Sequence, residues 1–466
     1  MIKFRWPLVA VLALLGGCIN LVPHYERPEA PVSDKWLPPA STPKGDVAAD
    51  IGWQQFFTDN RLKRLLSLAL ENNRDLRLAT LNVEKAQAQY RIKRADTLPT
   101  IDASVSGTHT RTPASSSSTG SATTTHEYSA ELGLSSYELD LYGRVHNLQG
   151  EALEDYLELT ETRRSTQISL VAETATAWLT LASDNELLRL AQETVTSQQK
   201  TYELTKGKYA LGYSSELSVV QAQTSVESAR VDAAEYESDV LQDINALRLL
   251  VGSDIPDELL PGPSLESAAA LVQVPAGLPS SLLQRRPDVL AAEHDLKSAN
   301  IDIGVARAAF FPTITLTADA GSSSAALSRL FKSGSGGAWT FAPSISVPIF
   351  DGGSNRATLD KAKTEREIQV QTYQQTLQSA FKEVANALAV RSTLDRRIEA
   401  QQALTDASRK SFELSDALYR GGSDSYLDAL DAQRSLYSAQ QDLISLRLTE
   451  QSNRVTLYKV MGGGWN

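Results

Sequence analysis

Cysteine and methionine are almost absent from this chain, which has one cysteine and two methionines among 466 residues. A single cysteine excludes a disulfide framework and a cysteine-based zinc site. The five histidines are scattered along the sequence and suggest no metal-ligand cluster. No serine or histidine motif suggests a catalytic nucleophile. We therefore expect neither an enzyme nor a bound cofactor or metal.

Basic surface and long apolar runs are also lacking. The formal net charge is −11 at pH 7, which disfavours nucleic acid or anionic lipid as a partner, because both require basic patches. Beyond the N-terminal region, no apolar run is long enough for a transmembrane helix. If the body of the chain spans a membrane, we expect it to do so as β-structure.

The N-terminus has the pattern of a bacterial lipoprotein signal peptide. Residues 1–6 include two basic side chains, and 8–15 form an apolar run too short to span a bilayer. Leu15-Gly16-Gly17-Cys18 follows and resembles a lipobox. We expect residues 1–17 to be removed and Cys18 to be acylated, as by palmitate. No aspartate follows Cys18, so the usual inner-membrane retention signal is missing. The alternative is an ordinary signal peptide with a chance cysteine.

The body of the chain is an internal repeat. Residues 143–252 match 353–462 at a constant offset of 210, as in Val251-Gly252 against Met461-Gly462. Upstream the offset is 213, so a three-residue difference lies between about 101 and 143, as expected for a surface hairpin. A unit of about 200 residues suits a pseudo-symmetric duplication better than a solenoid. We place the first repeat at 59–255 and the second at 287–466, with an extended segment at 18–58 and a linker at 256–286.

Proline is missing from 114 to 255 and after Pro348. Because proline costs roughly 3 kcal/mol inside a helix, these two gaps indicate long helices. Glycine followed by serine or aspartate predicts a C-cap and then an N-cap, which places a reversal near 209–215 and another near 419–425. Each repeat is therefore expected to contain a helical hairpin on the order of 100 Å long, preceded by a shorter helix (about 59–97 and 287–311).

Four segments alternate strictly between apolar and polar residues, as strands do. They are 101–106, 128–135, 313–320 and 339–349, and they form two predicted hairpins (about 100–141 and 313–350) with loops at 108–126 and 322–337. Four strands cannot close a membrane barrel, because exposed strand edges are not tolerated in hydrocarbon. The chain would then share its strands with other copies. The alternative is the edge of a soluble β-sandwich.

In order and spacing, several short motifs resemble those of one family. They are the lipobox at Cys18, Trp53-Gln54-Gln55-Phe56-Phe57 before Asp59-Asn60-Arg61-Leu62, Leu98-Pro99-Thr100, Glu138-Leu139-Asp140-Leu141-Tyr142-Gly143-Arg144, Arg285-Arg286-Pro287-Asp288, Phe311-Pro312-Thr313, Pro348-Ile349-Phe350-Asp351-Gly352-Gly353, and Tyr458-Lys459-Val460-Met461-Gly462-Gly463-Gly464-Trp465. The whole chain resembles the TolC family of outer-membrane factors, in its lipoprotein branch serving resistance-nodulation-division (RND) multidrug pumps.

This resemblance implies an α+β membrane protein that assembles as an oligomer. Three chains would form a homotrimer, with a twelve-stranded β-barrel in the outer membrane and a periplasmic α-barrel of long helices. A central equatorial region would contain the N- and C-terminal segments. The implied partners are outer-membrane lipid, a periplasmic membrane-fusion adaptor and a proton-driven inner-membrane RND pump. The channel would be a passive exit duct for drugs and toxic compounds.

The two hairpin tips differ in charge. Asp424, Asp428 and Asp431 are spaced i, i+4, i+7, which places them on one face of a helix. The first repeat has Ser218 and Gln221 opposite Asp428 and Asp431. The simplest interpretation of these three aspartates is a solvent-exposed helix face without a function of its own.

By resemblance, Asp428 and Asp431 match acidic constriction rings at the periplasmic entrance, and Leu427 matches an apolar ring beside them. Asp424 stands where some relatives have a basic gate residue, and Arg420 is the alternative candidate for that role. The tip residues Tyr209, Gly212, Tyr419 and Gly422 are expected to form the adaptor-docking surface.

Two other functions stay open from the sequence. One is the exit duct of a metal-export or type I protein-secretion system. The few methionines argue weakly against copper or silver export, and the lipobox favours drug-type pumps over secretion. The other is a structural coiled-coil envelope lipoprotein without a pore.

Overall fold

The computed structural model describes residues 19–33, 50–118, 120–265, 280–332 and 336–465. The predicted signal peptide and Cys18 lie outside these residues. The chain forms two compact units. One consists of the segment through Pro28 with Val83–Leu159 and Ala292–Tyr373, and the other of Glu29–Asn82, Thr160–Ala291 and Gln374–Asn466. Each unit therefore combines residues from both halves of the sequence repeat.

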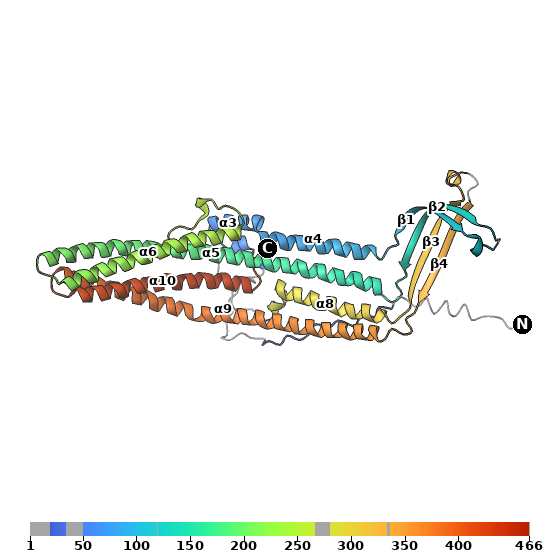
Figure 1. The fold of residues 1–466 in the computed structure, drawn as a ribbon. Coiled ribbons are helices and arrows are strands. Elements are labelled where there is room, and N and C mark those ends of the chain that lie inside the picture. The colour runs from blue at the N-terminus through green and yellow to red at the C-terminus, as the bar shows by residue number, and fades with distance from the viewer. Residues whose placement is uncertain (1–18, 34–49, 119, 266–279, 333–335, 466) are drawn as a thin grey trace. The chain divides into compact units, whose positions relative to one another are not determined.

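The helices follow the repeat closely (Figure 1). The two longest, α5 (Arg144–Ala210) and α9 (Ser354–Arg420), have 67 residues each and begin 210 positions apart. Each is followed by a return helix, and each repeat begins with a shorter one. These helices are α6 (Glu216–Val251), α10 (Tyr426–Val460), α4 (Arg74–Ala95) and α8 (Pro287–Ala308). The first repeat adds α3 (Asn60–Asn72), and α2 (Trp53–Phe56) lies in the segment before it. No helix within the described ranges is both long and apolar enough to cross a bilayer.

The four strands form one antiparallel sheet in the order β1-β2-β3-β4 (Figure 1). They are β1 (Ile101–Thr112), β2 (Thr123–Glu138), β3 (Thr313–Ser324) and β4 (Gly336–Ser346). The register brings the apolar residues of all four strands onto one face, as in the row Ile101, Leu134, Ala318 and Phe341. The predicted fold class of long helical hairpins and a four-stranded sheet is confirmed.

The predicted ends of the strands were wrong in three places, one of them the second loop, which was expected over 322–337 although β3 runs to Ser324 and β4 begins at Gly336. The first loop was expected over 108–126, but β1 and β2 pair as far as Thr112 and Thr123. Threonine is β-branched and favours extended backbone, so the Ser/Thr-rich composition did not mark a loop here. The last strand was expected to reach residue 349, but β4 ends at Ser346, just before Val347-Pro348. Proline provides no N–H for a ladder and restricts the residue before it.

The N- and C-terminal motifs meet in one hydrophobic core. Phe56 stacks on Tyr458 with ring centroids 3.9 Å apart, and the Tyr458 hydroxyl donates to the Ile51 carbonyl at 2.6 Å. Trp178 of α5 is fully buried in the same cluster and donates its indole N–H to the Leu259 carbonyl at 3.0 Å. These contacts give the aromatic motifs near both chain ends a packing role.

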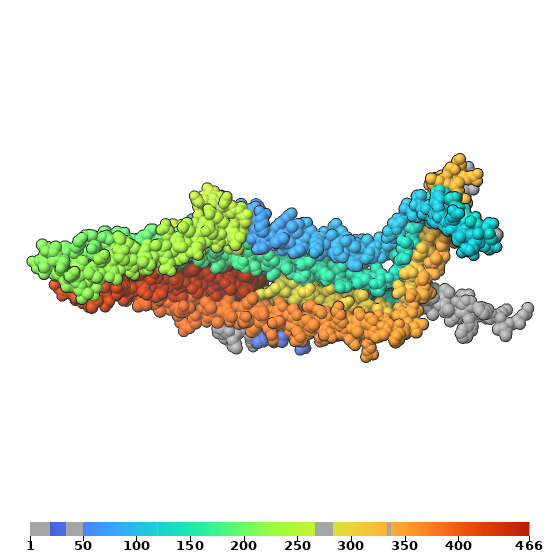
Figure 2. All heavy atoms as spheres, in the orientation of Figure 1, coloured from blue at the N-terminus to red at the C-terminus, as the bar shows by residue number. Residues whose placement is uncertain are grey.

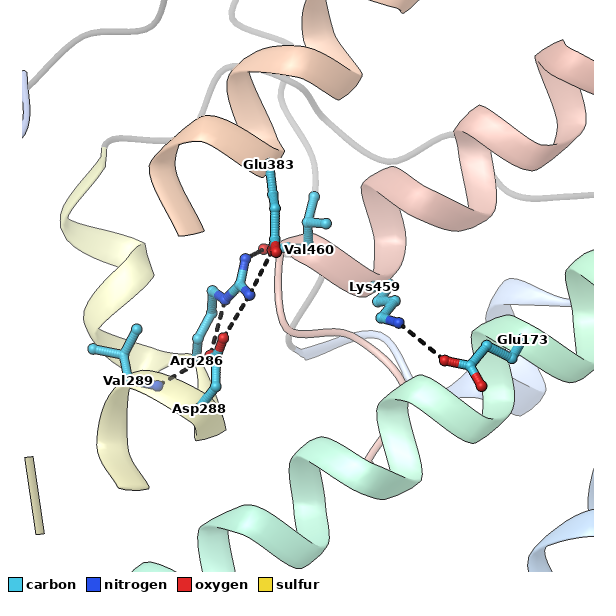
Figure 3. Close-up of polar contacts among 7 residues, drawn as sticks. All are labelled: Glu173, Arg286, Asp288, Val289, Glu383, Lys459 and Val460. Atoms are coloured by element: carbon cyan, nitrogen blue, oxygen red, sulfur yellow. Dashed lines mark hydrogen bonds and ion pairs between the residues drawn. The ribbon is translucent and has the colours of Figure 1, made fainter. Parts of the chain in front are cut away.

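One polar contact recurs in both repeats and ties the end of the return helix to the start of the short helix. In the first repeat, Asn73 is buried and donates to the Leu250 carbonyl at 2.8 Å. In the second, the equivalent residue Arg286 donates to the Val460 carbonyl at 2.9 Å (Figure 3). A last-turn helix carbonyl lacks an intrahelical partner, so both contacts satisfy a group that would otherwise be orphaned.

Candidate functional site

Both hairpins reverse through the same backbone motif. Gly212 and Gly422 each have φ of 78°, the left-handed conformation that ends a helix. The Tyr213 N–H donates to the Lys208 carbonyl at 2.8 Å, and the equivalent Ser423 N–H donates to the Leu418 carbonyl at 2.9 Å. These bonds are those of a Schellman motif. Ser215 and Ser425 then cap the return helices, so the reversals lie where the glycine and serine pattern predicted.

The two hairpins lie against each other at their tips (Figure 2). A small apolar cluster joins Ala222 of α6 to residues of the other hairpin, namely Tyr419 of α9 and Tyr426, Ala429 and Leu430 of α10. The rings of Tyr419 and Tyr426 are 5.5 Å apart in an edge-on arrangement. Burial of these residues fixes which face of α10 points away from the first hairpin.

Tyr419 is held by polar contacts as well as by packing. Its hydroxyl is 2.7 Å from the Thr205 hydroxyl, and its carbonyl accepts a hydrogen bond from Lys208 Nζ at 2.6 Å. The Lys208 ammonium also lies 4.0 Å from the centre of the Tyr419 ring, within cation–π range. Tyr419 is 4% exposed, whereas its repeat equivalent Tyr209 is 46% exposed. The Tyr419 side chain therefore offers no docking surface in the described chain, and Tyr209, Gly212 and Gly422 remain candidates.

The predicted gate residues share the exposed face of α10 and its capping turn. Asp424, Leu427, Asp428 and Asp431 are all exposed, and Leu427 is half-exposed at 50%. We call the three carboxylates the acidic tip face.

The capping turn also fixes the state of one carboxylate. The Ser425 hydroxyl donates to Asp428 Oδ2 at 2.6 Å, and the Asp428 N–H donates back to Ser425 Oγ at 3.3 Å. The bond from Ser425 lowers the pKa of Asp428, and the side chain of Asp424 lowers it further. Asp428 is therefore held as an anion at neutral pH.

The first hairpin repeats this turn without carboxylates at the positions of Asp428 and Asp431, although Glu216 lies in the first turn of α6. Ser218 takes the place of Asp428, and its N–H donates to Ser215 Oγ at 3.2 Å. Gln221, which stands opposite Asp431 in the repeat, is half-buried. Arg420 forms an ion pair with Asp416 one turn earlier on α9, with Nε 2.8 Å from Oδ2. The structure thus pairs Arg420 within its own helix.

A second concentration of carboxylates lies between α5 and α8. The titratable groups that face one another there are Glu151, Glu154, Asp155 and Glu158 of α5, His294, Asp295 and Asp302 of α8, and Lys93 of α4. Burial, with Asp302 and Asp155 nearby, raises the pKa of Glu151 to about 7. Burial, with Glu158 and Asp155 nearby, raises the pKa of Asp295 to about 6. The folded chain therefore binds protons at these carboxylates between α5 and α8 more tightly than the unfolded chain does.

Because of these raised pKa values, we expect the protein to be more stable in mild acid than at alkaline pH. A raised carboxyl pKa contributes stability that is complete below the unfolded value near 4 and is lost as the pH rises through about 6 and 7. Discounting for solvent screening, we expect roughly 1 kcal/mol from each group. The double variant Glu151→Gln, Asp295→Asn should melt higher than wild type at pH 8, and this difference should vanish as the pH falls to about 4. Exposed Glu71→Gln is the control, and an unchanged pH profile of melting in the double variant would contradict this assignment.

In the part of the chain that the structure describes, no group of three or more His, Cys, Asp or Glu side chains is placed to hold a metal ion. The tips present carboxylates, exposed backbone turns and exposed apolar side chains, among them Leu211, Tyr213, Leu217 and Leu427. Such an arrangement can repel anions and bind another protein surface.

Comparison with known proteins gives consistent matches over the whole length. The model of the outer membrane efflux protein family matches residues 65–253 and 278–463. The toluene efflux pump outer membrane protein TtgC and the antibiotic efflux pump outer membrane protein ArpC, both of Pseudomonas putida, are each 48% identical, covering 100% of this chain and 96% of the relative. The open state of the Neisseria gonorrhoeae MtrE outer membrane channel superposes with a TM-score of 0.87 at 38% identity, covering 96% of this chain and 99% of MtrE.

Proposed function

Since the chain belongs to the outer membrane efflux protein family, we propose that it is the passive exit duct of a tripartite pump for antibiotics and toxic organic compounds. The family places the protein in the outer membrane as an efflux component and not as an enzyme. It also removes the alternative of a coiled-coil lipoprotein without a pore. The observation that supports the proposed substrate class is the 48% identity over the full chain to toluene and antibiotic efflux proteins.

We propose that three chains complete the pore. The sheet of one chain ends in two edge strands, β1 and β4, whose unpaired backbone groups would be unsatisfied in a bilayer. Its apolar face is open to solvent in the single chain: Ile101 is 74% exposed and Trp339 77% exposed. Joining β4 of one copy to β1 of the next satisfies both edges, and three copies give a twelve-stranded barrel whose apolar face contacts lipid. A covalent lipid on Cys18 would add an anchor.

The hairpin tips would form the periplasmic entrance. In a trimer, the acidic tip face occurs three times and its carboxylates form successive rings, with Leu427 beside them. Such rings favour cations and oppose closure unless they are protonated or bound by cations. A periplasmic adaptor, itself bound to an inner-membrane RND pump, would dock on the exposed residues Tyr209, Gly212 and Gly422.

One experiment tests both the duct and its docking surface. The chain is expressed in a host lacking its own outer-membrane efflux component but retaining the cognate adaptor and pump. We expect the minimal inhibitory concentrations of toluene and antibiotics to rise several-fold. A photo-crosslinking amino acid at position 209 should capture the adaptor, while the same group at buried position 419 should not. Unchanged susceptibility with full surface expression would refute the duct, and equal capture from both positions would refute the docking surface.

A further inference from the structure

Two of the five histidines meet near the loop end of the β1–β2 hairpin. His109 and His126 are direct cross-strand partners. Their Nδ1 atoms are 2.7 Å apart, and their rings lie 4.6 Å apart at 75°. The sequence had suggested five scattered histidines, and for this pair that expectation was wrong. Their separation of 17 positions conceals a pairing that only the strand register creates.

The neighbouring pair of the same register supports His109. The Tyr128 hydroxyl is 3.2 Å from His109 Nε2, and the two rings are 5.5 Å apart and nearly perpendicular. Gly107 faces Tyr128 across the strands. A Cβ atom at Gly107 would stand only 3.2 Å from the Tyr128 ring, so the absent side chain lets the ring lie across β1 and reach the histidine. One end of His109 is thus held while its Nδ1 faces His126.

We propose that His109 and His126 bind a divalent transition-metal ion of the zinc or copper class through their Nδ1 atoms. Two Nδ1 atoms at 2.7 Å cannot both bear protons, so the pair presents one lone pair already directed at the other ring. Zinc–nitrogen bonds of 2.0–2.1 Å at a tetrahedral angle need about 3.3 Å between the two nitrogens. Both side chains are exposed, and a small rotation about their side-chain bonds supplies that opening.

Tyr128 acts as a positioning residue in this site. A metal on His109 Nδ1 requires the ring proton on Nε2, and that N–H then donates to the Tyr128 oxygen. Metal-binding histidines regularly make such a contact with their second nitrogen, which fixes the tautomer and the ring orientation. In the neutral pair one ring carries its proton on Nδ1, and on binding that proton moves to Nε2 of the same ring, so no net proton is released. Water completes the coordination of an ion held by two imidazoles.

The charges around the pair set its affinity. Thr124 and Arg111 form the next cross-strand pair on the same face, and the Arg111 guanidinium disfavours a nearby cation. We therefore expect micromolar rather than tighter binding. The site does not rest on the proposed efflux function, because it needs only the β1–β2 register and three side chains.

The test is zinc binding to the full-length protein, purified in detergent without a histidine tag. Titration calorimetry with zinc chloride should give one ion per chain, and His109→Thr or His126→Thr should weaken binding at least tenfold. Threonine suits these positions because it favours strands and already pairs across them at Thr110 and Thr125. Tyr128→Phe should weaken binding only a few-fold. His146→Ala is the matched control, since His146 is exposed on α5 and should leave binding unchanged.

A second readout identifies the ligand atoms. Electron paramagnetic resonance with one equivalent of copper(II) should show coupling to two imidazole nitrogens in the wild type and lose it in the His109→Thr, His126→Thr double variant. The absence of zinc binding to the wild type, or equal affinity in the double variant, would overturn the proposal. The two rings would then form a hydrogen-bonded imidazole pair only.

Discussion

Replacing Arg286 with alanine is expected to lower the free energy of unfolding by about 2–4 kcal/mol. Its guanidinium is buried and forms four hydrogen bonds (Figure 3). Two go to Asp288, at 3.0 and 2.7 Å, one to Glu383 at 2.9 Å, and one to the Val460 carbonyl at 2.9 Å. Burial alone would lower the pKa of Arg286, but Asp288 and Glu383 outweigh it and raise the pKa.

The loss of stability is expected to be large because the substitution leaves three polar groups without their hydrogen-bonding partner. Alanine leaves the Val460 carbonyl at the end of α10 without a partner and leaves two carboxylates without their cation. Removing one side of a buried ion pair usually costs 3–5 kcal/mol. The side chains of Asp288 and Glu383 are 34% and 46% exposed, so water compensates in part and the lower range applies. Arg286→Lys keeps the charge but not the planar fork, and should lose an intermediate amount.

Lys459→Ala is the matched control for this prediction. Its ammonium lies 3.5 Å from Glu173 in the same region (Figure 3), but both side chains are substantially exposed, at 35% and 57%. Exposed ion pairs contribute at most about 1 kcal/mol. Thermal melting of the purified proteins, followed by circular dichroism, compares the two variants. If Arg286→Ala and Lys459→Ala melted at the same temperature, the hydrogen bonds of the Arg286 guanidinium would not contribute the predicted stability.

The hairpins were predictable because their signals are local. A helix end needs a glycine in the left-handed conformation and a following cap, and Gly212, Ser215, Gly422 and Ser425 provide both at equivalent positions. The apolar face of the sheet was predictable for the same reason, since alternation by two assigns every residue to a face. Helical spacing correctly placed Asp428 and Asp431 on the exposed side of α10, but Asp424 precedes the N-cap Ser425 and lies outside the helix, so its predicted place on that helical face was wrong.

Contacts between distant segments were not predictable in this way. Tyr209 and Tyr419 are identical in the repeat, yet one is exposed and the other buried. The difference arises because Lys208 and Thr205 of the first hairpin meet Tyr419, whereas the equivalent positions in the second hairpin are Leu418 and Ser415. A single sequence shows these substitutions but not which surfaces they bring together.

Strand register was the other missing information. A loop expected over 108–126 put both His109 and His126 in irregular backbone, where no pairing could be inferred. Register depends on the length of the turn between two strands. The Ser/Thr-rich composition gave no sharp turn signal, so neither the pair nor the role of Gly107 could be inferred from the sequence.

Removing two of the three charges of the acidic tip face is expected to change the ion selectivity of the channel. In Asp428→Asn, Asp431→Asn, the cation-to-anion permeability ratio in a planar bilayer should fall several-fold at low salt and less at high salt, because mobile ions screen the rings. Asparagine is preferred to alanine because its side chain can still accept the hydrogen bond from Ser425. Block by multivalent cations added on the tip side should weaken in parallel, since such ions bind to paired carboxylates.

The control must distinguish the effect of carboxylates at the tips on ion selectivity from the effect of carboxylates elsewhere on the protein. Asp406→Asn, Asp442→Asn removes the same number of carboxylates from exposed positions elsewhere on the second hairpin and should leave selectivity unchanged. The reciprocal variant, Ser218→Asp with Gln221→Asp, puts the two carboxylates on the first tip and should raise cation preference, because both hairpins reverse through the same motif. If the tip and control variants gave equal selectivity, the acidic tip face would lie outside the conduction path. The narrowest part of the pore would then have to be formed by other residues.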